Sequence, residues 1–185
     1  MSFKSSFLPI GIGSLPHKDP IQASEIILNY FPESPYWPQL PSKRFEEGML
    51  AQFNEGMPGL VFEGERIYFR TPFNPPSEWE KYYEVSSGEN LDDFAIGKEY
   101  ASGLYALLEL LKGKKPLLIK GQITGPITLG LGLSDEKKIP ILYDPNLKEM
   151  LLKTIASRAR WQEREFRRVV PELSLIHISE PTRPY

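Results

Sequence analysis

Apolar and polar positions alternate along the chain in blocks that predict strands and helices by turns. The apolar run from Leu8 to Ser14 ends in glycines and predicts a buried first strand. Asp19-Pro20 then supplies a helix N-cap and a first-turn proline, and residues 21–30 carry apolar side chains at helical spacing. Residues 36–39 predict a short second strand.

The middle of the chain predicts a helix followed by a hairpin. Residues 45–53 have apolar side chains at helical spacing. Two short apolar runs, 60–62 and 66–69, lie on either side of Gly64 and predict a β-hairpin. The polar, proline-bearing stretch 71–89 is interpreted as an excursion from the main fold.

The last part of the chain predicts two long helices with a strand between them. Residues 90–112 predict one helix, and residues 116–122 predict a further buried strand. Asp144-Pro145 again places a helix N-cap before a first-turn proline, and predicts a helix that runs to about Val170. The cations of this last helix alternate with glutamates, which predicts a solvated face with ion pairs: Arg158, Arg160, Arg164, Arg167 and Arg168.

The order of these elements decides the fold class. Strands alternating with helices favour a parallel sheet of the α/β class. A complete (β/α)8 barrel needs about 250 residues, whereas this chain has 185. Residues 1–172 are therefore predicted to form the N-terminal half of a TIM-type (β/α)8 barrel with an inserted β-hairpin.

The end of the chain differs in character from the rest. Leu173 to Arg183 reads LSLIHISEPTR, which resembles, residue for residue, the translation of a transposon adapter used in sequencing libraries. Residues 173–185 are therefore interpreted as a non-native tail, so His177 is no ligand candidate. The alternative is that residues 174–179 form the next barrel strand.

Composition narrows the classes of function. The net charge is −2 without a basic stripe, which argues against a nucleic-acid partner. The absence of cysteine excludes disulfides and thiolate metal ligands within these residues. The N-terminal apolar run is too short and too broken for a signal peptide or a membrane span. We expect a cytoplasmic protein without a membrane partner.

Two glycine-bearing turns carry the candidate chemistry. Ile12, Gly13 and Ser14 end the first strand, where glycines let a ligand approach the backbone and Ser14 adds a hydroxyl. Gln122 and Thr124 follow the strand 116–122 and offer polar groups at the same end of a parallel sheet. The alternative for both segments is a tight strand-to-helix turn.

His17 follows the first of these turns on the proposed active face. Its imidazole could contact a substrate or transfer protons. A loop histidine without a role is the alternative.

A family resemblance joins the two turns. Residues 12–16 resemble the opening motif of the catalytic barrel of cobalamin-independent methionine synthase, and residues 124–128 resemble its Thr-Gly-Pro-Val-Thr segment. Residues 36–41 are similar to shorter single-barrel relatives of the methionine-synthase-like and uroporphyrinogen-decarboxylase-like kinds. The resemblance covers residues 8–170.

The resemblance implies a methyltransferase-like barrel that transfers a methyl group to a zinc-activated thiol such as homocysteine, in methionine biosynthesis. Ile12, Gly13 and Ser14 would hold the thiol substrate. The family's zinc ligands come from later strands, so no metal ligand and no catalytic residue is assigned here, and the fragment is expected to be inactive. The methyl donor would be a folate or a corrinoid.

Two departures from the family pattern concern its substrates. The tryptophan that stacks on folate falls near Gly132, and an acidic substrate contact falls near Lys43. Alternatives are therefore an enzyme of the uroporphyrinogen decarboxylase type, and a partner of a corrinoid methyl-carrier protein.

Overall fold

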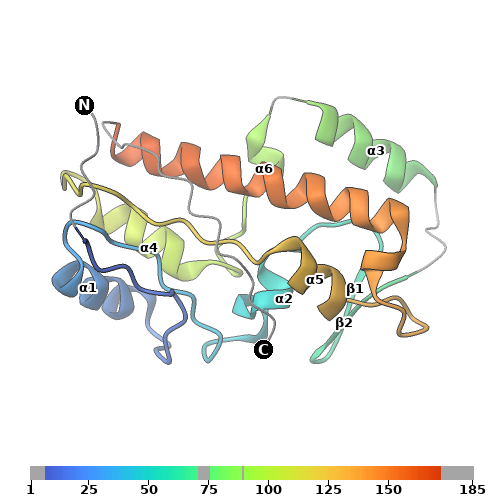
Figure 1. The fold of residues 1–185 in the computed structure, drawn as a ribbon, viewed down its shortest axis with the longest axis horizontal. Coiled ribbons are helices and arrows are strands. Elements are labelled where there is room, and N and C mark those ends of the chain that lie inside the picture. The colour runs from blue at the N-terminus through green and yellow to red at the C-terminus, as the bar shows by residue number, and fades with distance from the viewer. Residues whose placement is uncertain (1–6, 71–75, 89, 172–185) are drawn as a thin grey trace.

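The computed structural model describes residues 7–70, 76–88 and 90–171. The interpretation of residues 173–185 as a non-native tail, and that of residues 174–179 as a strand, lie outside these ranges. Within them the chain has a mixed α/β fold (Figure 1). The elements in chain order are α1 (Pro20–Tyr30), the 3₁₀ helix η1 (Phe45–Glu47), α2 (Met49–Gln52), β1 (Leu60–Glu63), β2 (Arg66–Phe69), α3 (Pro76–Ser87), η2 (Leu91–Phe94), α4 (Ser102–Leu110), α5 (Pro126–Gly132), η3 (Ile141–Tyr143) and α6 (Pro145–Val169).

Three extended segments lie side by side through single parallel bridges. Ser14 bridges Gln39, and Tyr36 bridges Lys120. The Gln39 amide donates to the Gly13 carbonyl at 2.9 Å, and the Lys120 amide donates to the Pro35 carbonyl at 2.9 Å. The segment 33–39 therefore lies between the other two. The bridges give parallel neighbours, as the alternation of strands and helices predicted, but they do not by themselves establish a barrel.

Helices cover the extended segments from two sides. In Figure 1, α1 and α4 lie below the segment 113–125, and α6 runs along its other side. The Ser24 hydroxyl of α1 donates to the Gly103 carbonyl of α4 at 3.4 Å, which ties these two helices together. The buried side chains of α4 and α6 belong to one hydrophobic core.

The two Asp-Pro signals begin helices as predicted. The Asp19 carboxylate accepts hydrogen bonds from the amides of Ile21 and Gln22, and α1 starts at Pro20. Asp144 caps α6 through the same pattern of contacts. Each carboxylate satisfies amides that the first helical turn leaves without partners.

The predicted hairpin is confirmed. Strands β1 and β2 pair antiparallel, with Glu63 opposite Arg66, so a two-residue turn joins them. Gly64 in this turn has a positive φ of 59°, which a residue without a Cβ adopts at little cost. The Phe69 amide donates to the Ser134 carbonyl at 2.9 Å and fastens the hairpin to the loop after α5.

The single helix predicted for residues 90–112 is wrong. Asn90 caps the 3₁₀ helix η2 instead, and α4 begins only at Ser102. Between them, the Gly97 amide donates to the Glu55 carboxylate at 2.7 Å. This contact and the complete burial of Ile96 hold the segment in a non-helical path.

Trp37 belongs to the hydrophobic core, and its side chain is fully buried. Its indole Nε1 donates to the Gln162 Oε1 atom on α6 at 3.1 Å. The same Oε1 accepts from the Gln122 amide at 3.2 Å, and the Gln162 Nε2 donates to the Gln122 carbonyl at 2.8 Å. One side chain of α6 thus joins two of the extended segments.

The predicted solvated face of α6 is correct for its last two turns and wrong for Arg158. Arg167 and Glu163 form an ion pair at 3.2 Å, and Arg168 and Glu165 form one at 2.8 Å. Arg158 is only 3% exposed. It lies four residues after Thr154 and four before Gln162, both of which are buried, and therefore belongs to the inward stripe.

Candidate functional site

The two predicted turns meet in the structure. A Cβ atom built on Gly13 would overlap the Oε1 atom of Gln122, so the Gln122 side chain lies directly against the Gly13 backbone. Gln122 also donates from Nε2 to the Trp37 carbonyl. Gly13 is buried and has a φ of 132°. The backbone of the first turn and the amide of the second therefore share one site.

Lys120 joins this site and was missed by sequence reasoning. Its ammonium group donates to the carbonyls of Gly11 and Ile12 at 2.9 and 3.0 Å. It is half-buried and fixes the glycine turn from the neighbouring segment. A lysine within the apolar run 116–122 is the signal that could have revealed it, because a cation in a buried strand needs polar partners.

The other predicted residues differ in their surroundings. Ile12 is 80% exposed, and Ser14 is exposed as well. His17 is half-buried, and its Nδ1 atom is buried without a hydrogen-bond partner among the described residues. The Thr124 hydroxyl donates to the Met49 carbonyl at 3.3 Å, so it holds the start of α2.

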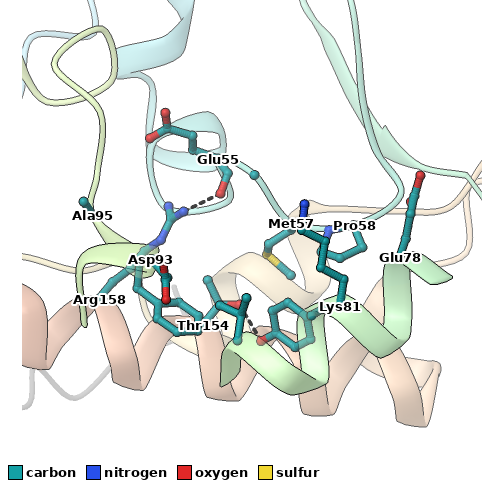
Figure 2. A pocket seen from close by; sticks show the side chains of 13 residues that line it. Glu55, Met57, Pro58, Glu78, Lys81, Asp93, Ala95, Thr154 and Arg158 are labelled. Atoms are coloured by element: carbon teal, nitrogen blue, oxygen red, sulfur yellow. Dashed lines mark hydrogen bonds between the residues drawn. The ribbon is translucent and has the colours of Figure 1, made fainter. Parts of the chain in front are cut away.

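A second candidate site is a cavity of about 490 Å³ between α3, η2, α6 and the loop after α2 (Figure 2). None of the predicted substrate-binding residues lines it. Its wall carries both charged and apolar side chains. Its lining residues include Glu55, Met57, Pro58, Glu78, Lys81, Tyr82, Val85, Asp93, Phe94, Ala95, Thr154 and Arg158.

Arg158 is the most deeply buried charged group on this wall. Its Nη1 donates to the Gln52 carbonyl at 3.1 Å, and its Nη2 donates to the Glu55 carbonyl. Burial lowers the pKa of Arg158 to about 10, although the negative charge of Glu55 opposes this shift. The guanidinium therefore stays protonated at neutral pH.

Tyr82 closes the same wall between α3 and α6. Its hydroxyl lies 2.9 Å from the Met150 carbonyl and 2.9 Å from the Thr154 Oγ1. Burial raises the pKa of this phenol, so it is neutral at physiological pH. Sequence reasoning missed this cavity because its residues come from four separate parts of the chain, with no motif to join them.

A third polar cluster lies between η1 and the start of α4. The Ser102 hydroxyl donates to the Glu47 Oε1, and the Lys43 ammonium donates to the Ser102 Oγ at 2.8 Å. Glu47 is 1% exposed, and its Oε2 has no partner among the described residues. Burial raises the pKa of the Glu47 carboxyl, whereas the hydrogen bond from Ser102 and the positive charge of Lys43 act to lower it.

Replacing Glu47 with glutamine is expected to stabilise the chain at neutral pH. Because the folded state holds the carboxyl proton more tightly than the unfolded chain does, ionised Glu47 lowers stability above its raised pKa. That cost disappears as the pH falls through the raised pKa to the ordinary one. Urea unfolding of E47Q and the wild type should therefore differ at pH 7 and converge near pH 4.

The exposed Glu25 of α1 provides the control for this measurement. E25Q should change the free energy of unfolding by less than about 0.5 kcal/mol at either pH. The Lys43 ammonium lies 3.7 Å from the Glu47 Oε1 and forms an ion pair with it. An E47Q protein that is less stable than the wild type at pH 7 would show that this ion pair outweighs the cost of burial.

Among the described residues, no group of three or more histidine, cysteine, aspartate or glutamate side chains could hold a metal ion. Nor does any helix in these ranges combine the length and apolar character needed to cross a membrane.

The chain matches no family model, no curated protein and no solved structure. The family resemblance therefore depends on the motifs themselves, at residues 12–16 and 124–128.

Proposed function

We propose that this chain is the N-terminal half of a methyltransferase-like barrel, whose whole protein transfers a methyl group to a thiol such as homocysteine. The observation that supports this most is the direct contact between Gly13 and Gln122. Gly13 belongs to the first of the two motifs that suggest the family, and Gln122 lies two residues before the second, yet these two residues are 109 positions apart in the chain. This is the arrangement that a shared substrate pocket at the strand ends requires.

Parallel bridges support the barrel part of the proposal. Ser14 with Gln39, and Tyr36 with Lys120, give three adjacent segments that run in one direction. The connections between them pass through α1 and α4, which contact each other. Parallel neighbours connected through helices are what successive βαβ units have.

The chain's own residues would bind and orient the thiol substrate. The exposed Ser14 hydroxyl is available to accept or donate a hydrogen bond. Lys120 fixes the carbonyls of Gly11 and Ile12 and so keeps the turn in one conformation. The described residues do not supply a zinc site, and the cysteine and histidine ligands expected from later strands belong to the proposal for the whole protein.

The test is substrate binding by the full-length gene product, recovered by sequencing past the codon for Glu172. Homocysteine should protect the amides around Ser14 from hydrogen exchange, and the purified protein should contain zinc. A metal-free protein in which homocysteine leaves these amides unprotected would contradict the proposal.

Replacing Ser14 with alanine in that protein should raise the KM for the thiol by about 2–10-fold, the loss expected for one neutral hydrogen bond. The exposed Ser87 at the end of α3 is the matched control, and S87A should leave KM unchanged. Steady-state kinetics on both variants measures the difference. An equal KM for S14A and the wild type would show that the Ser14 hydroxyl does not bind the thiol substrate.

A further inference from the structure

Arg158 differs from an ordinary structural arginine in the partners it lacks. A guanidinium has five N–H groups, and those of Arg158 have two acceptors, the carbonyls of Gln52 and Glu55. Its Nε atom is buried and has no acceptor among the described residues. Arg158 therefore has N–H donors without an acceptor in the part of the chain that the structure describes.

The charge of Arg158 is also uncompensated. Among the residues that the structure describes, no carboxylate lies within ion-pair distance of it. Glu55 acts on it only from farther away, because the Glu55 carboxylate accepts from the Gly97 amide instead. A buried cation without a counter-ion is costly, and an anion beside it would offset that cost.

The open space beside Arg158 has room for such an anion. The cavity of about 490 Å³ falls within the usual range of small-molecule sites, about 300–1,000 Å³. Figure 2 shows Arg158 at one end of the lining residues and Lys81, Met57 and Pro58 towards the other.

The rest of the wall indicates what kind of anion fits. Apolar side chains line much of it: Met57, Pro58, Val85, Phe94 and Ala95. Asp93 and Glu78 also line it and would repel a group with more than one negative charge. A single carboxylate at the Arg158 end, attached to an apolar body, satisfies both conditions.

We propose that Arg158 and this cavity form a binding site for a small molecule with one carboxylate and an apolar body. The carboxylate accepts from the guanidinium donors that have no partner in the chain, and the body packs against Val85, Phe94 and Met57. The site does not depend on methyl transfer, because none of the residues around Gly13 and Gln122 lines it.

Isothermal titration of the 185-residue chain tests the proposal with three probes: phenylbutyrate, its neutral analogue phenylbutyramide, and inorganic phosphate. Phenylbutyrate should bind, the amide at least about tenfold more weakly, and phosphate not measurably, since a hydrogen bond to a charged group contributes about 1.5–3 kcal/mol. Equal binding of the acid and its amide, preferential binding of phosphate, or no binding of phenylbutyrate would overturn the proposal.

Variants locate the binding. Arg158→Gln should weaken phenylbutyrate binding by about thirtyfold or more, as expected for a buried charged contact. Arg160→Gln changes an exposed arginine on the same helix and should leave binding unchanged. Val85→Phe keeps Arg158 but adds a ring to the wall where the apolar body packs, so it should weaken phenylbutyrate binding by about tenfold or more without unfolding the chain. If the folded Val85→Phe protein binds phenylbutyrate with wild-type affinity, the binding site is not this cavity. This conclusion holds whatever Arg158→Gln does to folding.

Discussion

Replacing Gly13 with alanine should lower the free energy of unfolding by about 1.5–3.5 kcal/mol. One contribution is backbone strain, about 1–2 kcal/mol for an L-residue forced into an unfavourable φ, here 132°. The other is overlap of the new methyl group with the Gln122 carboxamide, which would have to move away and give up its hydrogen bond to the Trp37 carbonyl, about 0.5–1.5 kcal/mol. Urea unfolding of the two proteins measures the sum.

Two further variants separate these contributions. Gly113 has a φ of 76° with open space around it, so G113A should show the strain alone. In a Gln122→Ala background, the free-energy cost of G13A should no longer include the part that comes from overlap. A double-mutant cycle isolates this part. Equal costs for G13A and G113A would contradict the contact between the two turns.

Replacing Trp37 with alanine should cost about 3–5 kcal/mol, the range for a large aromatic side chain removed from a core. Trp37 is fully buried, contacts Phe53 edge-on with ring centroids 6.5 Å apart, and donates to Gln162. Its removal leaves a cavity and takes one donor from a buried amide oxygen. Thermal and urea unfolding should both show the loss.

Tyr30 is the matched control for this substitution, since its side chain is 76% exposed. Y30A should change stability by no more than about 0.5 kcal/mol. Trp37→Phe should fall between the two, because it keeps most of the volume and loses the N–H donor. A loss of less than about 1 kcal/mol for W37A would mean that the core does not depend on this residue.

The sequence correctly predicted the elements that begin at a signal within a few neighbouring residues. Asp19-Pro20 and Asp144-Pro145 begin helices because the carboxylate and the proline act within one turn. The break before α4 could not be predicted in this way. It depends on Glu55, 42 residues from the Gly97 amide that it accepts from, and the leucine spacing of residues 104–111 extends smoothly into the preceding segment.

The same distinction between local signals and contacts of distant residues applies to the candidate site. The glycine turn and Gln122 were found because glycine and polar residues directly follow apolar runs there, which is a local signal, and the structure brings them into contact. Arg158 was assigned to solvent because its neighbours in sequence are charged. Its helical phase, between Ile155 and Gln162, was the better guide. The cavity beside it is assembled by tertiary contacts and has no counterpart in any short stretch of sequence.

Gln162 has a consequence for how far two of the extended segments can pair. The Lys120 amide donates to the Pro35 carbonyl, and in an extended segment residue 122 directs its N–H and C=O to the same side as residue 120. The Gln162 carboxamide takes both of these groups, so it stands where the next pair of bonds to the segment 33–39 would form. Longer pairing between these two segments therefore requires this part of α6 to move away.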